Sequence, residues 1–176
     1  MKVTMVMLSS VDGRTTKGDQ SDIYVWTSLE DQDYFFSLIK KSKVIIMGAK
    51  TYEAVRSRLK LEEKKLRIVL TRHPEKYKSH TILGQLEFSS EKPQQLLERL
   101  NKLKYKKALL VGGGIINGLF LKQNLVNEFF LTIEPRIFGE GKNVVEGQLL
   151  DKSLQLMSMK KLNEAGTLLL RYKVNK

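Results

Sequence analysis

The chain has 176 residues, with apolar and charged fractions of 41% and 28%, which is ordinary for a globular protein with a sizeable core. It contains no cysteine, so disulfides, thiol nucleophiles and cysteine-ligated zinc are excluded, and two histidines are too few for a histidine-rich metal site. The longest uncharged apolar run near the start, residues 3–8, is too short for a membrane span or the core of a signal peptide. We therefore expect a cytoplasmic protein with no metal and no membrane partner.

The formal net charge is +12, from 31 basic and 19 acidic side chains. Lysine pairs recur along the chain, which is typical of solvated surfaces but is also compatible with attraction of an anionic cofactor or substrate. No basic block is interleaved with aromatic residues in the manner that stacks nucleic-acid bases, so a nucleic-acid-binding protein is the least favoured class. His73 and His80 stand in a loop-like stretch and are expected at the surface.

Short apolar runs alternate with amphipathic segments, without repeats or linkers, which predicts one α/β domain over residues 1–176. Strands are expected over residues 3–8, 44–47, 66–70, 81–83, 108–111, 128–134, 154–160 and 168–174. Helices are expected over residues 29–41, 52–59, 93–103 and 115–123. A turn-like stretch at 163–166 separates the last two strands, so we expect a mostly parallel central sheet with a C-terminal antiparallel hairpin and flanking helices.

The first strand-to-helix joint that draws attention follows residues 44–47. Gly48 permits a sharp turn, Thr51 can cap the next helix, and Lys50 adds a positive charge at a helix start that favours an anion. Two interpretations stay open here, a phosphate-binding turn and a simple capped connection.

The second joint follows residues 108–111 and carries three consecutive glycines, Gly112, Gly113 and Gly114. Such a run loses much chain entropy on folding and lets a ligand approach the backbone, again at a helix start. Spacing to Gly118 resembles a Rossmann loop only weakly, because that fingerprint normally occupies the first strand-to-helix turn of a domain. A purely structural glycine turn remains the alternative.

An acid stands beside the apolar stripe of the helix expected over residues 29–41. Asp31, Phe35 and Leu38 fall at i, i+4 and i+7 and so share one face. Asp31 can form a capping box with Ser28, or it can face a ligand from a buried position. Periodicity alone favours the cap.

These segments together resemble the dihydrofolate reductase superfamily, including the reductase domain of riboflavin biosynthesis, over nearly the whole chain. The matching motifs occur in family order: Ser9-x-x-Asp12-Gly13, Gly48-Ala49-Lys50-Thr51-Tyr52, Leu70-Thr71-Arg72, Val111-Gly112-Gly113-Gly114, and Leu125-Val126-Asn127-Glu128 with Pro135-x-x-x-Gly139-x-Gly141. Each motif is weak alone, and the order of five carries the resemblance. It implies hydride transfer from NADPH to a C=N bond.

The resemblance also implies roles for individual residues. Cofactor contacts are expected from Leu8, Gly48, Ala49, Lys50, Thr51, Leu70, Thr71, Arg72, Val111, Gly112, Gly113, Gly114 and Ile115. Asp31 becomes the catalytic acid with Thr132 as its partner, which reverses the preference for a cap. Trp26, Asp31, Phe35 and Lys65 are expected at the substrate.

Two substrates compete under this resemblance. Trp26 five places before Asp31, and Leu131-Thr132-Ile133, are similar to folate reductases, which makes the reduction of dihydrofolate to tetrahydrofolate the first expectation. The alternative is a riboflavin-pathway reductase acting on 5-amino-6-(5-phosphoribosylamino)uracil or a related pyrimidine phosphate, although the A-D-D-P-x-L-x-x-R segment of that branch is missing. Either enzyme would act on a small molecule as a monomer or homodimer.

Overall fold

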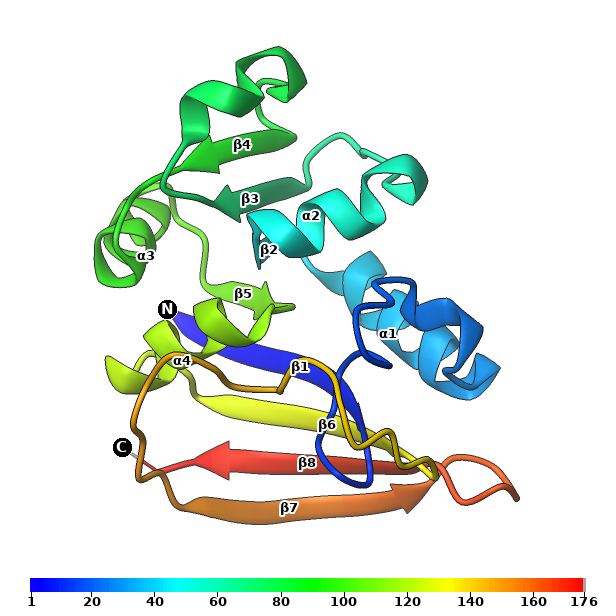
Figure 1. Cartoon of the computed structure of the whole chain (residues 1–176). Helices are drawn as coiled ribbons and strands as arrows, with labels where there is room; N and C mark the ends of the chain where they lie inside the picture. Colours follow the sequence, from blue (N-terminus) through cyan, green and yellow to red (C-terminus); the bar gives the residue numbers. More distant parts are fainter. Residues whose placement is uncertain (176) are drawn as a thin grey trace.

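The computed structural model of the chain describes residues 1–175 and has an eight-stranded sheet at its centre (Figure 1). The strands run in the order β4-β3-β2-β5-β1-β6-β8-β7. Their bounds are β1 Lys2–Ser10, β2 Val44–Gly48, β3 Leu66–Leu70, β4 Leu86–Ser89, β5 Lys107–Leu110, β6 Glu128–Glu134, β7 Leu154–Lys161 and β8 Leu168–Val174.

Strands β1 to β6 pair in parallel, and β8 and β7 join them antiparallel at one edge. This arrangement confirms the predicted α/β class with a mostly parallel sheet and a C-terminal hairpin. Strand β2 is buried along its whole length, as expected for a parallel strand covered on both faces. In contrast, all eight residues of the edge strand β7 are exposed.

Helices cover both faces of the sheet. Their bounds are α1 Leu29–Lys41, α2 Ala49–Val55, α3 Pro93–Lys102 and α4 Gly114–Lys122, with 3-10 segments at Ile23–Val25, Arg56–Arg58 and Pro74–His80. Helices α3 and α4 pack on one face, while α1 and α2 pack on the other.

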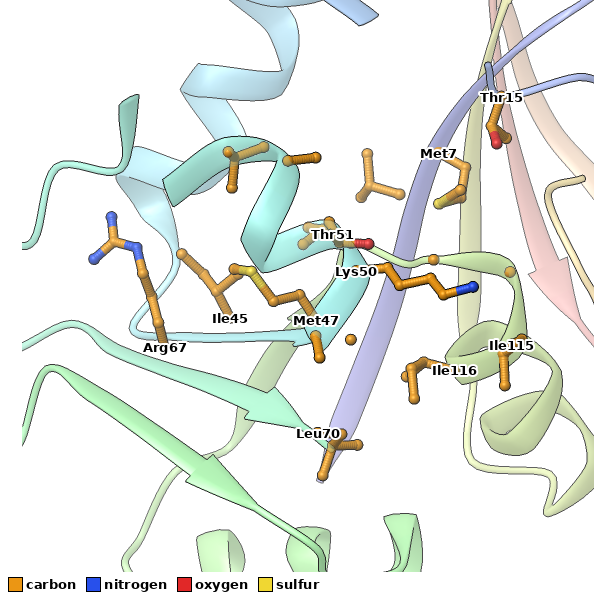
Figure 2. A pocket seen from close by; sticks show the side chains of 18 of the residues that line it. Met7, Thr15, Ile45, Met47, Lys50, Thr51, Arg67, Leu70, Ile115 and Ile116 are labelled. Carbon is orange, nitrogen blue, oxygen red and sulfur yellow. The ribbon is translucent and has the colours of Figure 1, made fainter. Parts of the chain in front are cut away.

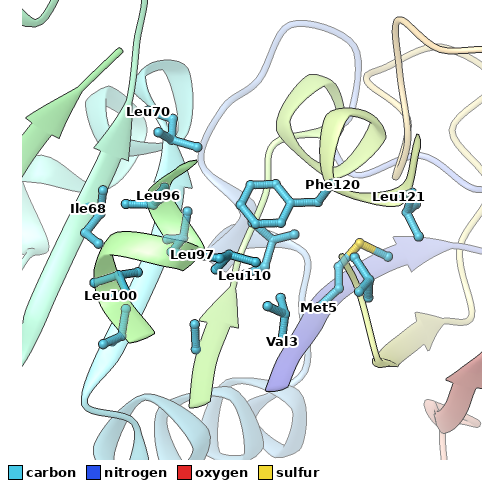
Figure 3. Packing of buried hydrophobic residues seen from close by; sticks show 14 of the residues in the cluster. Val3, Met5, Ile68, Leu70, Leu96, Leu97, Leu100, Leu110, Phe120 and Leu121 are labelled. Atoms are coloured by element: carbon cyan, nitrogen blue, oxygen red, sulfur yellow. The ribbon is translucent and has the colours of Figure 1, made fainter. Parts of the chain in front are cut away.

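The core follows from the two-residue period of the strands (Figure 3). On β2, Val44 and Ile46 point toward α3 and α4, whereas Ile45 and Met47 point toward α1 and α2. Phe120 of α4 is fully buried on the first of these faces. Burying each large apolar side chain stabilises the fold by about 1.5–3 kcal/mol.

Two predicted elements differ from the structure. The strand expected over residues 81–83 is only an isolated bridge from Ile82 to Leu86, because Gly84, at a φ of 73°, reverses the chain; the strand at this edge is β4. The helix expected over residues 52–59 begins at Ala49 and ends at Val55. Here a tertiary contact to Gly48, described below, turns the backbone earlier than the sequence pattern indicates.

The prediction that both histidines lie at the surface is correct only for His73, which is exposed. His80 is half-buried, and its Nδ1 lies 3.0 Å from the Tyr52 hydroxyl. Tyr77 and Phe88 complete an aromatic cluster around this pair, which therefore stabilises the edge of the sheet. Neither the apolar content nor the spacing of this stretch indicates the cluster.

Candidate active site

A cavity of about 2000 Å³ lies where the parallel strands end. Leu8, Gly48, Leu70, Ser89 and Val111, each at or just after the carboxyl end of its strand, line it. Ligands in open α/β sheets bind at this edge. Pockets for one small molecule usually measure about 300–1,000 Å³, so this cavity has room for a dinucleotide and a second ligand.

The two glycine turns meet directly at the cavity. The backbone N–H of Gly48 donates a hydrogen bond of 2.8 Å to the carbonyl of Gly112. A β-carbon on Gly48 would lie 2.8 Å from Cγ1 of Ile116, and one on Gly112 would lie 2.9 Å from Sδ of Met7. Gly112 also has a φ of 91°, which side chains rarely adopt, and a cis peptide bond joins it to Gly113. Packing thus favours glycine at both positions, and at Gly112 the positive φ favours it as well.

The other two glycines of the triplet have different surroundings. A β-carbon on Gly114 would lie 2.5 Å from the Asn143 carbonyl oxygen, so this residue allows close packing of a neighbouring loop. A β-carbon on Gly113 would meet only the Thr51 hydroxyl oxygen, at 3.4 Å. Gly113 lines the cavity, so its missing side chain leaves space for a ligand rather than for protein.

Basic side chains border this part of the cavity. Lys50 lies in the first turn of α2 and extends toward Ile115 at the start of α4 (Figure 2). Arg72 follows β3 and is exposed at the cavity wall. Thr51 is not a helix cap, because Gly48 occupies the N-cap position without a side-chain hydrogen bond. The first N–H groups of α4 have no partner within the helix and so add to the positive potential here.

Asp31 lies at the opposite part of the cavity and is not the cap of α1. Ser28 is the N-cap, and its hydroxyl accepts the Asp31 backbone N–H at 3.3 Å. The Asp31 side chain instead lines the cavity while being only 4% exposed. Burial raises its pKa to about 6; hydrogen bonding to Thr132 opposes this rise, and the nearby Glu134 carboxylate adds to it.

Most predicted site residues line this one cavity. They are Leu8, Asp31, Phe35, Gly48, Ala49, Lys50, Thr51, Leu70, Thr71, Arg72, Val111, Gly113, Gly114 and Ile115. Four lie outside its wall: Trp26, Lys65, Gly112 and Thr132.

Each of these four has protein neighbours that account for its position. The Trp26 ring is buried and packs edge-on against Phe138, with ring centres 4.9 Å apart. The Lys65 ammonium is buried and pairs with Glu62 at 2.8 Å, so it does not reach the cavity. Thr132 is buried on β6, where it acts on the pKa of Asp31, and the Gly112 carbonyl accepts the Gly48 N–H.

Two arginines outside the predicted site residues also line the cavity. With a folate substrate, the resemblance would have required Lys64, Lys65 or Arg67 to bind the glutamate tail. Arg67 has a side chain only 4% exposed; its Nη2 lies 3.6 Å from Glu62, and its buried Nη1 has no hydrogen-bond partner among residues 1–175. Arg58 forms two hydrogen bonds with the Asp22 carboxylate, at 2.9 and 2.8 Å. Arg67 is therefore a buried cation at the cavity wall whose Nη1 donor is unused among residues 1–175. A charged residue inside an otherwise apolar strand was the available signal.

Within the described part of the chain, no cluster of three or more His, Asp or Glu side chains is arranged to hold a metal ion. No helix of these residues is long and apolar enough to cross a membrane.

The fold is shared with solved reductases, although sequence identity is low. A pyrimidine reductase-like protein of Corynebacterium diphtheriae matches with a TM-score of 0.77 and 14% identity, over 99% of this chain and 92% of that one. RibD of Acinetobacter baumannii matches with a TM-score of 0.77 and 18% identity, over 99% of this chain and 58% of that one. Dihydrofolate reductase of Enterococcus faecalis, crystallised with NADP(H), matches with a TM-score of 0.65 and 15% identity, over 99% and 97%. The chain thus has the dihydrofolate reductase-like fold.

The model of the RibD C-terminal domain family matches residues 1–168, so the chain belongs to that family. It is accordingly an oxidoreductase domain of the dihydrofolate reductase-like class, as the motifs predicted. The uncharacterized protein YwjB of Bacillus subtilis is 23% identical over 167 residues, covering 93% of this chain and 94% of that protein. The family match favours the riboflavin-type alternative over dihydrofolate, which the sequence motifs placed first.

Proposed function

We propose that residues 1–176 form one NADPH-dependent reductase domain that reduces a C=N bond of a pyrimidine, of the type used in riboflavin biosynthesis. One observation carries this proposal: the hydrogen bond from Gly48 to Gly112 joins two open backbone turns beside the same cavity that Asp31 lines. A bound dinucleotide and a substrate would therefore meet in one enclosed space.

The residues at the glycine turns fit the cofactor. Gly113 leaves open a volume that a β-carbon would fill, and Lys50 lies beside it. The N–H groups at the start of α4 and the Lys50 ammonium would hold the pyrophosphate. Arg72 would recognise the 2′-phosphate that distinguishes NADPH from NADH, because a guanidinium binds phosphate oxygens through two parallel hydrogen bonds. Leu8, at the cavity wall, would offer its backbone to the carboxamide of the nicotinamide.

When bound, NADPH supplies the hydride, and the chain's own residues manage the proton. With a pKa of about 6, Asp31 is protonated in about one tenth of molecules at pH 7 and in most molecules below pH 6. A protonated Asp31 would hydrogen-bond the substrate nitrogen and transfer its proton there, which makes the neighbouring carbon more electrophilic. Thr132 would hold the carboxyl in place. Phe35 would pack against the substrate ring from the next turn of α1.

Arg67 supports a substrate that carries an acidic group. Its Nη1 donor is buried at the cavity wall without a partner in residues 1–175, and an unpaired buried donor is costly unless a ligand satisfies it. A phosphate of a ribosylaminopyrimidine would satisfy it, and so would the carboxylate of dihydrofolate. Because the family match favours the pyrimidine, the phosphate is the proposed occupant.

A side-by-side assay tests this proposal. NADPH consumption is followed by absorbance with 5-amino-6-(5-phosphoribosylamino)uracil, with its dephosphorylated form and with dihydrofolate. We expect turnover with the phosphorylated pyrimidine and a higher KM without the phosphate. Turnover with dihydrofolate alone would assign the enzyme to the folate branch, and no NADPH consumption or binding with any substrate would refute the proposed function.

A further inference from the structure

Glu134, the last residue of β6, is a buried acid that plays no part in the proposed function as stated so far. Its side chain is 3% exposed and accepts three hydrogen bonds. The Ser28 backbone N–H donates at 2.8 Å and the Ser28 hydroxyl at 2.7 Å, both to Oε1. The Thr167 hydroxyl donates at 2.8 Å to Oε2. Glu134 therefore ties the start of α1 to β6 and to the residue before β8.

The proton positions in this network follow from its partners. The Ser28 hydroxyl oxygen accepts the Asp31 N–H, and the Thr167 hydroxyl oxygen accepts an Asn163 amide N–H at 3.0 Å. Each hydroxyl must therefore direct its single proton at Glu134. In this network Glu134 thus serves as an acceptor only, and all three of its bonds come from residues outside β6.

Glu134 also shares a strand face with Thr132, because the two residues are two positions apart on β6. Both residues act on the pKa of Asp31: hydrogen bonding with Thr132 lowers it, and the negative charge of Glu134 raises it. One strand face thus brings both effects to Asp31.

We propose that Glu134 is a positioning residue for Asp31: its bonds to Ser28 hold the start of the helix that carries Asp31, and it sets a second carboxyl group beside that acid on the face of β6. This inference rests on the proposed function and assigns that site a paired-carboxylate device in which one acid stays charged and the other carries the proton. The charge acts by disfavouring a second negative charge nearby.

Other ionisable groups around Asp31 do not replace this effect. Tyr24 and Tyr34 also face it, and burial raises the pKa of each phenol above its ordinary value, so both are neutral near pH 6. The cations closest to these phenols are engaged elsewhere: the Arg58 guanidinium with Asp22, and the Arg171 guanidinium over the rings of Tyr34 and Phe130. Glu134 is the anion that faces Asp31 within residues 1–175.

The direct test is carboxyl-carbon NMR titration of Asp31 in the cofactor-free protein. In Glu134→Gln, which keeps the shape and removes the charge, we expect the Asp31 midpoint to fall by about one pH unit. Glu134→Asp keeps the charge and should leave the midpoint near that of the wild type. Glu128→Gln, at the other end of β6, is the matched control and should change nothing.

A purely structural role for Glu134 predicts the opposite order, with the shorter aspartate more disruptive than glutamine. An unchanged Asp31 midpoint in Glu134→Gln, or an equal fall in Glu134→Asp, would overturn the proposal. If Glu134→Gln does not fold, Glu134→Asp decides alone: a lower Asp31 midpoint in this variant, which keeps the charge, would refute the proposal. Since this titration needs neither NADPH nor substrate, its outcome is independent of the proposed reaction.

An activity profile supplies the second readout. Where the enzyme turns over, the pH at which kcat/KM declines should move to lower pH in Glu134→Gln by the same amount as the NMR midpoint. A decline that stays in place while the midpoint moves would show that Asp31 is not the group that delivers the proton.

Discussion

Asp31 should destabilise the folded protein at neutral pH, because it must lose its proton in a buried position. Its pKa rises from the ordinary 3.8 to about 6 on folding, a difference of about two units. At 1.36 kcal/mol per unit, ionised Asp31 reduces the free energy of unfolding by about 3 kcal/mol above pH 6. Between pH 4 and pH 6 the folded state binds more protons than the unfolded state, so this contribution to stability falls as pH rises.

The variant Asp31→Asn removes this titration and keeps the size of the side chain. We expect it to be more stable than the wild type at pH 7.5, with a difference of about 3 kcal/mol that shrinks toward zero as pH falls from about 6 to about 4. Its reductase activity should drop at least about 100-fold, because a positioned general acid contributes about 10² to 10⁴ in rate. Higher stability with lower activity is typical of a strained functional residue.

Urea unfolding followed by fluorescence of Trp26, the one tryptophan of the sequence, measures the stability difference at each pH. Asp33→Asn is the matched control, since it makes the same substitution at an exposed position of the same helix. A stability difference between Asp31→Asn and the wild type that does not change between pH 4 and pH 7.5 would refute the reasoning.

Three further predictions concern the rest of the site. Gly113→Ala should fold like the wild type yet bind NADPH about ten-fold more weakly by fluorescence titration. Gly112→Ala should instead lower the Tm, because only Gly112 has a positive φ and a close protein neighbour. Equal effects of the two variants on the Tm would contradict this prediction. Arg72→Gln should raise the KM for NADPH about ten-fold and leave that for NADH unchanged, and a parallel rise in both would show that Arg72 does not read the 2′-phosphate. Asp12→Ala should lower the Tm at pH 7, because Asp12 accepts backbone N–H groups of Phe138 and Gly139 at 3.2 and 2.7 Å. The Ser10 hydroxyl and these bonds lower the pKa of Asp12 from 3.8 to about 2, so the Tm difference should shrink as the pH falls through that range. A Tm difference that stays constant over that range would contradict the assignment.

The local sequence pattern predicted a helix or strand correctly where a capping residue or an apolar, β-branched run marks its ends. The structure reproduces the predicted helix over residues 29–41 and the strand over 128–134, because the Ser28 cap and an apolar, β-branched run define them locally. Residues 81–83 have a strand composition, yet Gly84 turns the chain back before a strand forms. The start of α2 depends on the hydrogen bond between Gly48 and Gly112, 64 positions apart in sequence, and no local pattern contains it.

The candidate site likewise has features that the local sequence indicates and features that depend on contacts between distant residues. The glycine turns stood out by residue type, although residue type alone left a structural turn open, and the site role of Asp31 came from the family resemblance. The environment of Asp31 was not predictable, because Glu134 and Ser28 are 106 residues apart and meet only in the folded sheet. The burial of Arg67 and of Lys65 likewise depends on how the segment before β3 packs. Periodicity placed Asp31 on an apolar face and favoured a cap there; the family resemblance, not the local pattern, indicated a ligand-facing acid.

A crystal structure of the complex with NADP⁺ would test most directly whether the glycine turns and Asp31 form one site. We expect the pyrophosphate against Gly113 and Lys50, the 2′-phosphate beside Arg72, and the nicotinamide ring directed toward Asp31. A dinucleotide bound away from the glycine turns, or one whose nicotinamide ring points away from Asp31, would contradict this assignment.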